Sequence, residues 1–154
     1  MKKRLIVSIL VIVSLFMIVG CNSKKIKSSE NDNNIIENDS AEVISSMKVI
    51  INGKQYVIQL EDNKTAKSFV NLLPQEYNMS ELNGNEKYIY LDITLPTNPS
   101  NPKHINSGDV MLYGNNCLVI FYKSFDTSYS YTKVGHIDNL DNLGNGSITA
   151  KFEN

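Results

Sequence analysis

Apolar residues occupy every second position in two short runs, 47–51 and 56–60, and this alternation limits the fold more than any other feature of the chain. A period of two is typical of strands that bury one face. Asn52-Gly53 lies between the runs and suits a type I′ turn, because both central positions of that turn require positive φ. The sequence therefore predicts a β-hairpin at the start of the folded part.

One short helix is expected after the hairpin. Apolar residues from Ala66 to Leu73 recur at i, i+3, i+4 and i+7, which places them on one face of a helix. Asp62 or Asn63 can cap its first turn, and Pro74 ends it.

The rest of the chain contains short apolar runs separated by turn residues such as Gly114-Asn115-Asn116 and Gly144-Asn145-Gly146. Strands at intervals of about ten residues, without long helices between them, favour a mainly β fold. We expect a small closed antiparallel β-barrel with one or two short helices. The predicted strands are 88–93, 110–113, 117–122, 131–137 and 147–152.

The first twenty residues predict an export signal. Lys2, Lys3 and Arg4 precede an uncharged apolar stretch, 5–19, and the small residue Gly20 follows it. This order of charged, apolar and small residues is typical of a secretory signal peptide.

The tetrad Ile18-Val19-Gly20-Cys21 ends this segment. It resembles the lipobox of bacterial lipoproteins, although leucine is commoner than isoleucine at its first position. The resemblance implies that 1–20 is removed, that Cys21 is diacylated, and that the chain is anchored at the extracytoplasmic face of the cell membrane. Two acyl chains anchor stably. An ordinary secretory signal and an uncleaved membrane anchor are the alternatives. The apolar stretch is somewhat short for a membrane anchor, because a spanning helix needs roughly 20 residues.

The expected organisation is a lipidated Cys21, a flexible polar linker over 21–46 and one domain over 47–154. The linker is rich in Lys, Ser, Asn, Asp and Glu, so it cannot bury enough apolar surface to fold. Cys117 is the only other cysteine, which leaves no pair for an intramolecular disulfide.

Charge argues against nucleic acid as a partner. Removal of 1–20 takes away three of the 15 basic residues and leaves twelve against 16 acidic ones, a net charge near −4. Nucleic-acid binding requires a basic patch. Arg4 is the only arginine, so the mature chain has none.

Several segments of the predicted domain form a second set of motifs: Asn52-Gly53-Lys54, Glu86-Lys87-Tyr88-Ile89-Tyr90-Leu91, Ser107-Gly108-Asp109-Val110-Met111 and Val134-Gly135-His136-Ile137. They resemble bacterial cyclophilin-like domain proteins. The resemblance covers about 47–152 and implies a compact antiparallel barrel whose openings are covered by one or two helices.

Cyclophilins proper are prolyl cis–trans isomerases, and the resemblance implies an arginine that hydrogen-bonds near the twisting amide. The mature chain offers no such residue, and lysine lacks the planar fork of donors. We therefore expect a non-catalytic module that binds a peptide or a small ligand. A weak or divergent isomerase acting on exported proteins and a structural interaction module of the envelope are the alternatives.

Aromatic residues gather in the C-terminal half, where tyrosine can pack a proline ring or an aliphatic group at little entropic cost. His136 could donate a hydrogen bond to a ligand. The candidate ligand-binding residues are Tyr113, Tyr122, Tyr129, Tyr131 and His136.

The other chemically active side chains favour structural roles. Asp109 follows Gly108 and suits a turn, where it accepts backbone hydrogen bonds. Cys117, in an apolar run, is typical of a small buried side chain. Glu86 and Lys87 begin a strand, where a charge pair is usually solvated. The sequence has no glycine-rich phosphate loop, no paired cysteines and no histidine spacing that predicts a cofactor or a metal.

Overall fold

The computed structural model describes residues 44–154, and the structural statements below concern this part of the chain. The predicted signal peptide 1–20, the lipidation residue Cys21 and most of the linker lie outside the described residues. Among the described residues, no helix is long and apolar enough to cross a membrane.

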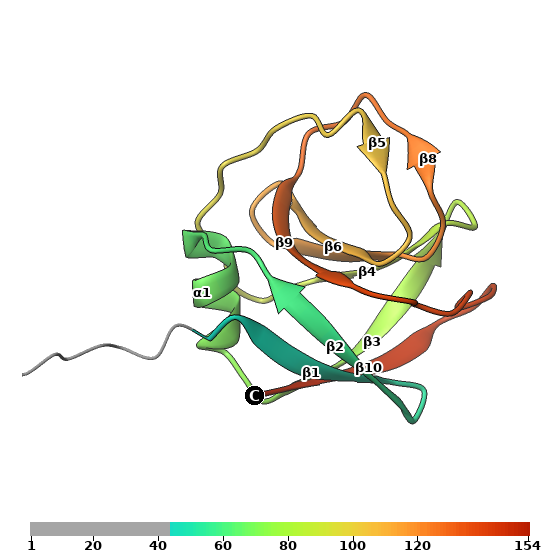
Figure 1. Cartoon of the computed structure of the whole chain (residues 1–154), viewed down its shortest axis with the longest axis horizontal. Helices are drawn as coiled ribbons and strands as arrows, with labels where there is room; N and C mark the ends of the chain where they lie inside the picture. The colour runs from blue at the N-terminus through green and yellow to red at the C-terminus, as the bar shows by residue number, and fades with distance from the viewer. Residues whose placement is uncertain (1–43) are drawn as a thin grey trace, which may run out of the picture. The chain divides into compact units, whose positions relative to one another are not determined.

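Eight antiparallel strands form a closed barrel in the order β1-β10-β3-β4-β7-β6-β9-β2. This confirms the expected mainly β architecture, with one helix, α1 (Lys64–Val70), in the described part. Figure 1 labels most of these strands and shows α1 at the left side of the barrel. A two-stranded ribbon is formed by β5 (His104–Ile105) and β8 (Phe125–Asp126). The barrel strands are β1 (Ser46–Ile51), β2 (Lys54–Leu60), β3 (Gln75–Leu82), β4 (Glu86–Tyr90), β6 (Asp109–Tyr113), β7 (Cys117–Phe121), β9 (Thr132–Ile137) and β10 (Ile148–Glu153).

The opening hairpin forms as the alternation predicts. Its register pairs Ile51 with Lys54, and Asn52 and Gly53 between them have φ values of 47° and 86°. Both values are positive, as a type I′ turn requires. The predicted inner face of β1 is buried.

The helix begins where the sequence predicts and ends earlier. The side chain of Asn63 accepts a hydrogen bond from the Ala66 amide at 2.8 Å, so Asn63 rather than Asp62 is the N-cap. The helix ends at Val70, and Leu73 lies beyond it, packed partly against the core. Phe69 meets Phe152 of β10 edge to face, with ring centroids 5.2 Å apart. The helix thus contributes its apolar face to the barrel interior.

Strand β3 is missing from the sequence-based prediction. Its eight residues, QEYNMSEL, contain few large apolar side chains, and only Met79 is fully buried. Its position between β10 and β4 comes from hydrogen bonds to partners far along the chain, which no local pattern specifies.

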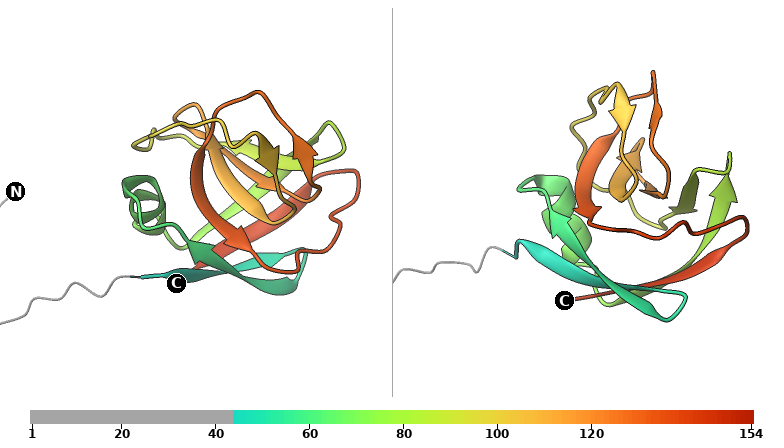
Figure 2. Two further views of the ribbon diagram at one scale, coloured as in Figure 1. Left: turned by 45° about the horizontal axis from the view of Figure 1, so that its top comes forward. Right: turned by 45° about the vertical axis from the view of Figure 1, so that its right-hand side comes forward.

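Strands β6 and β7 are covered on both faces. Leu118 and Ile120 belong to the interior cluster, whereas Cys117, Val119 and Phe121 belong to a second cluster on the outside of the barrel. The β5–β8 ribbon lies over this side (Figure 2) and contributes Ile105 and Phe125 to the second cluster. A continuous apolar run is what a strand buried on both faces requires.

Lys87 points into the barrel, which corrects the expectation of a solvated Glu86–Lys87 pair at the start of a strand. Its side chain is fully buried, and its Nζ donates to the Glu81 carboxylate and to the carbonyl oxygens of Gly144 and Gly146, the latter two at 2.6 and 2.7 Å. The Nζ also lies 4.7 Å from the centroid of the Tyr122 ring. Lys87 therefore connects β3, β4 and the loop that precedes β10.

Candidate ligand-binding pocket

A pocket of about 290 Å³ opens on the outer side of the barrel, over strands β4, β6 and β7. Five of the eight tyrosines of the chain line it: Tyr88, Tyr90, Tyr113, Tyr129 and Tyr131. We call it the tyrosine pocket. Its remaining lining residues are Leu82, Asn83, Glu86, Cys117 and Val119.

Strand alternation explains which side chains reach the pocket. Lys87 and Ile89 of β4 face the interior, so Glu86, Tyr88 and Tyr90 share the outer face. The same parity on β7 places Cys117 and Val119 outside.

The register then assembles these side chains across three strands. Cys117 of β7 pairs with Tyr90 of β4 on one side and with Tyr113 of β6 on the other. Val119 is likewise the partner of Tyr88. Directly paired side chains lie about 4.5–5.5 Å apart at their Cβ atoms. Small side chains on β7 thus form a floor between tyrosines on the two neighbouring strands.

The chain segment before β9 supplies the other wall. Tyr131 and Ser100 exchange backbone hydrogen bonds, which fix this segment against the loop before β5. The Tyr113 ring lies 6.1 Å from that of Tyr129 at an interplanar angle of 89°, and 5.6 Å from that of Tyr131 at 53°. Tyr131 is 8% exposed, whereas Tyr129 is 61% exposed. Tyr131 is therefore part of the base of the wall, and Tyr129 forms its rim.

Glu86 is the only charged residue that lines the pocket. Burial, and then the charge of Glu81, raise the pKa of the Glu86 carboxyl. Burial, followed by the charge of Glu86, raises the pKa values of the Cys117 thiol and of the Tyr131 phenol. A thiol with a raised pKa is a poor nucleophile, so Cys117 acts as a small side chain in the floor.

Three of the five candidate residues meet in this pocket, namely Tyr113, Tyr129 and Tyr131. Tyr122 does not line it. It follows β7 and its hydroxyl donates to Glu81 at 2.8 Å, beside Lys87. Burial, and then its contact with Glu81, raise the pKa of Tyr122 to about 12.

His136 also lies elsewhere. Its register partner is Asp109, the first residue of β6, whereas Tyr113 is the last. Four residues along a strand span about 13 Å, so His136 is distant from the pocket end of β6.

A scan against protein-family models finds the Cyclophilin-like family over residues 49–153. The chain belongs to the cyclophilin-like family. No curated protein and no solved structure matches it. The matched range includes all of the barrel except the first three residues of β1, so the tyrosine pocket lies within the cyclophilin-like domain.

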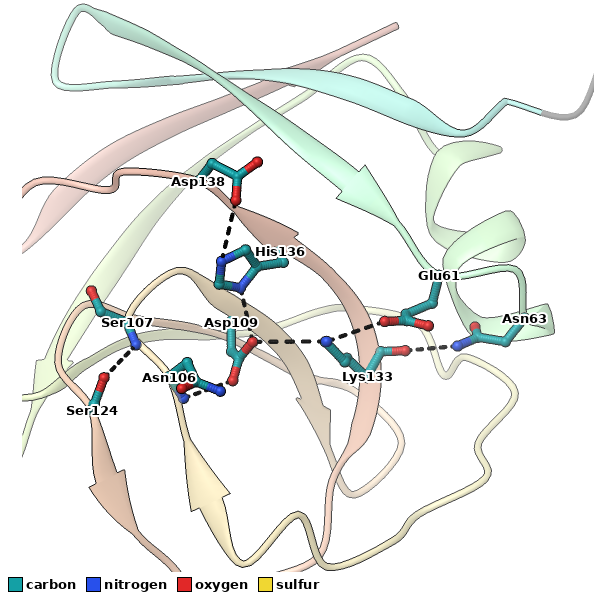
Figure 3. A network of polar contacts seen from close by, with 9 residues as sticks. All are labelled: Glu61, Asn63, Asn106, Ser107, Asp109, Ser124, Lys133, His136 and Asp138. Atoms are coloured by element: carbon teal, nitrogen blue, oxygen red, sulfur yellow. Dashed lines mark hydrogen bonds and ion pairs between the residues drawn. The ribbon is translucent and has the colours of Figure 1, made fainter.

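A polar network crosses the same cyclophilin-like domain between β6 and β9, as Figure 3 shows. Asp109, 3% exposed, accepts a hydrogen bond from the Asn106 amide at 2.8 Å, and its other carboxylate oxygen lies 2.9 Å from Nδ1 of His136. This confirms the turn role that the sequence predicts for Asp109. Nε2 of His136 lies 3.7 Å from Asp138.

The network continues toward the helix through Lys133. Its Nζ lies 3.2 Å from Glu61 and 4.0 Å from Asp109, and its carbonyl oxygen accepts a hydrogen bond from Asn63 at 2.8 Å. Every residue of this chain of contacts is paired with another, so the network joins β9 to the N-cap of α1. Among residues 44–154, no group of three or more His, Cys, Asp or Glu side chains is arranged so that it could hold a metal ion.

Sequence reasoning missed Glu86, Tyr88 and Tyr90. Their spacing of i, i+2 and i+4 shows that they share one face of a strand. Strand pairing places this face beside β7 and near Tyr113, and the sequence alone does not specify that pairing.

Proposed function

We propose that this cyclophilin-like protein is a lipid-anchored binding protein of the cell envelope. Its barrel binds a peptide or a small ligand in the tyrosine pocket and does not catalyse a reaction. The observation that supports this most is the gathering of five tyrosines around one hollow on the outer side of the barrel.

The composition of the pocket suits binding. Ligand sites combine apolar or aromatic walls with a few polar groups that orient the ligand. Tyrosine offers a large rigid contact area with few rotatable bonds, and its hydroxyl adds a hydrogen bond. The volume of about 290 Å³ lies just below the range for ligand pockets, roughly 300–1,000 Å³, which favours one or two side chains or a small molecule.

The residues of the pocket do not favour isomerase chemistry. No arginine occurs beyond Arg4, and the only charged group of the pocket is the carboxylate of Glu86. A carboxylate accepts hydrogen bonds and cannot donate one to a twisting amide when ionised.

Anchoring rests on the sequence of the N-terminal segment. The apolar stretch and the Ile18-Val19-Gly20-Cys21 tetrad support lipidation of Cys21, and the polar linker would allow the barrel to stand clear of the extracytoplasmic face of the membrane. Replacement of Cys21 by serine is expected to abolish acyl labelling and leave the precursor uncleaved. Unchanged labelling would contradict the anchor.

The binding proposal is tested by NMR titration of residues 41–154 with blocked peptides, one of them containing proline, combined with exchange spectroscopy on the same samples. We expect shifts confined to the outer face of β4, β6 and β7 and to 129–131, with unchanged cis–trans exchange. Accelerated exchange would make the protein an isomerase. Shifts confined to other surfaces would contradict the pocket.

A further inference from the structure

We propose that the tyrosine pocket binds an organic cation, an ammonium group on a short aliphatic stem, with Glu86 as its counter-ion and tyrosine rings as its walls. This inference rests on the proposed binding function and names the class of ligand.

The charge of the pocket points to a cation. Glu86 is the single charged residue among those that line it, and among the described residues it has no ion-pair partner. The neighbouring carboxylate, Glu81, is occupied by Lys87 and by the Tyr122 hydroxyl. The negative charge of Glu86 would therefore repel an anionic ligand, whereas a cationic ligand would neutralise that charge.

The partial burial of Glu86 strengthens the argument. Burial disfavours the ionised carboxylate, which is why the pKa of Glu86 is raised. A bound cation would attract the ionised carboxylate and so offset the solvation that the carboxylate loses by burial. The Glu86 carboxylate thus has no cationic partner among the residues that line the pocket.

The rings supply the second, independent argument. The faces of aromatic rings attract cations, and quaternary ammonium groups are recognised by cages of such rings. Tyr88 and Tyr90 stand at 81° to each other on one side, and Tyr113 stands at 89° to Tyr129 on the other. Neighbouring rings at steep angles turn their faces in different directions, so together they can contact a compact group from more than one side. This geometry suits a roughly spherical ammonium group.

The test is calorimetric titration of the full chain in a maltoside detergent, which contributes no ammonium group of its own. The probes are choline, its neutral carbon isostere in which carbon replaces the ammonium nitrogen, a blocked Gly-Lys-Gly peptide, and the same peptide with acetylated lysine. Each cation is expected to bind about fivefold to thirtyfold more tightly than its neutral counterpart. Tighter binding of choline would indicate a free small molecule, and tighter binding of the peptide would indicate a side chain.

Two variants assign the effect to the pocket. Glu86→Gln is expected to weaken choline binding about tenfold, and Tyr129→Leu, at an exposed position that the fold does not need, about fivefold. Both substitutions should weaken binding of the neutral isostere by a smaller factor than binding of choline, because only the charged probe interacts with the carboxylate and the ring quadrupole. The matched controls are Glu76→Gln on the exposed face of β3 and Tyr56→Leu on β2, which should leave all affinities unchanged.

The outcomes separate this inference from the binding function. Equal affinities of charged and neutral probes, or a Glu86→Gln variant that binds choline as the native protein does, would overturn the cation and leave the pocket as a binding site. If no probe binds and the peptide titrations also show no shifts at the pocket, both proposals are wrong.

Discussion

Replacement of Lys87 by methionine tests how the barrel depends on one buried cation. Methionine preserves most of the apolar length of the side chain but removes the ammonium group, which is fully buried and donates to Glu81, Gly144 and Gly146. Breaking a buried ion pair typically costs roughly 3–5 kcal/mol, because the remaining charge loses its partner.

The structure places Lys87→Met at the lower end of that range. The side chain of Glu81 is 20% exposed and retains hydrogen bonds from the Tyr122 hydroxyl and the Gly84 amide, so it is partly compensated. Gly144 and Gly146 are exposed, and water can replace the lysine at their carbonyls. We expect a loss of about 3 kcal/mol in the free energy of unfolding.

The assay is urea unfolding of residues 41–154 followed by circular dichroism, with the free energy extrapolated to water. Lys151→Met is the matched control, because the Lys151 side chain is 44% exposed in its ion pair with Glu153, and it should change the midpoint little. Glu81→Gln would leave the buried ammonium group without a counter-ion, so Lys87→Met combined with Glu81→Gln should cost less than the sum of the two single changes. A loss below about 1 kcal/mol for Lys87→Met, or strict additivity, would refute the reasoning.

Three further outcomes are expected. Glu86→Gln should raise the thermal midpoint at neutral pH, because the raised pKa of Glu86 means that its ionised form opposes folding. The gain should vanish at a pH low enough to protonate the carboxyl of Glu86 in the native protein. An equal gain at both pH values would contradict this reasoning. Spectrophotometric titration should show Tyr122 ionising near pH 12 in the folded protein. The contribution of Tyr122 to stability is present below pH 10 and is lost as the pH rises toward 12. Ionisation of every tyrosine near pH 10 would be evidence against the burial of Tyr122 beside Glu81. Gly108→Ala should destabilise the barrel far more than Gly114→Ala, since both glycines have positive φ but only at Gly108 would a Cβ lie 2.1 Å from a backbone oxygen, that of Ile137; similar losses in denaturant unfolding would exclude that contact.

The barrel was predictable where the burial pattern is local. The alternation in β1 and β2 and the Asn52-Gly53 turn specify a hairpin without reference to the rest of the chain. The unbroken apolar run of β7 predicts a strand. Apolar residues occupy both of its faces, rather than alternate positions only, because its outer face belongs to the second cluster outside the barrel.

Lys87 was not predictable because its burial depends on distant partners. Glu81 is close in sequence, but the two carbonyls come from residues nearly sixty positions later. A lysine at the start of a strand is ordinarily solvated, and only the closed barrel brings the 144–146 loop to its ammonium group.

The pocket was partly predictable by parity. Cys117, Val119 and Phe121 alternate on the outside of β7, so the next residue, Tyr122, turns to the opposite side, and this pattern already separates it from the pocket. The register of β4 on β7, which brings Tyr88 and Tyr90 to the pocket, depends on hydrogen bonds between strands about thirty residues apart.

The central claim is that ligand contacts the tyrosine pocket, and intermolecular NOE measurement tests it most directly. The sample would be isotope-labelled 41–154 with choline or with the peptide that binds best, observed with isotope filtering. We predict NOEs from the ligand to ring protons of Tyr113, Tyr129 and the other pocket tyrosines, and none to Tyr56, Tyr77 or Tyr122. Ligand NOEs restricted to those three tyrosines or to other surfaces would contradict the account.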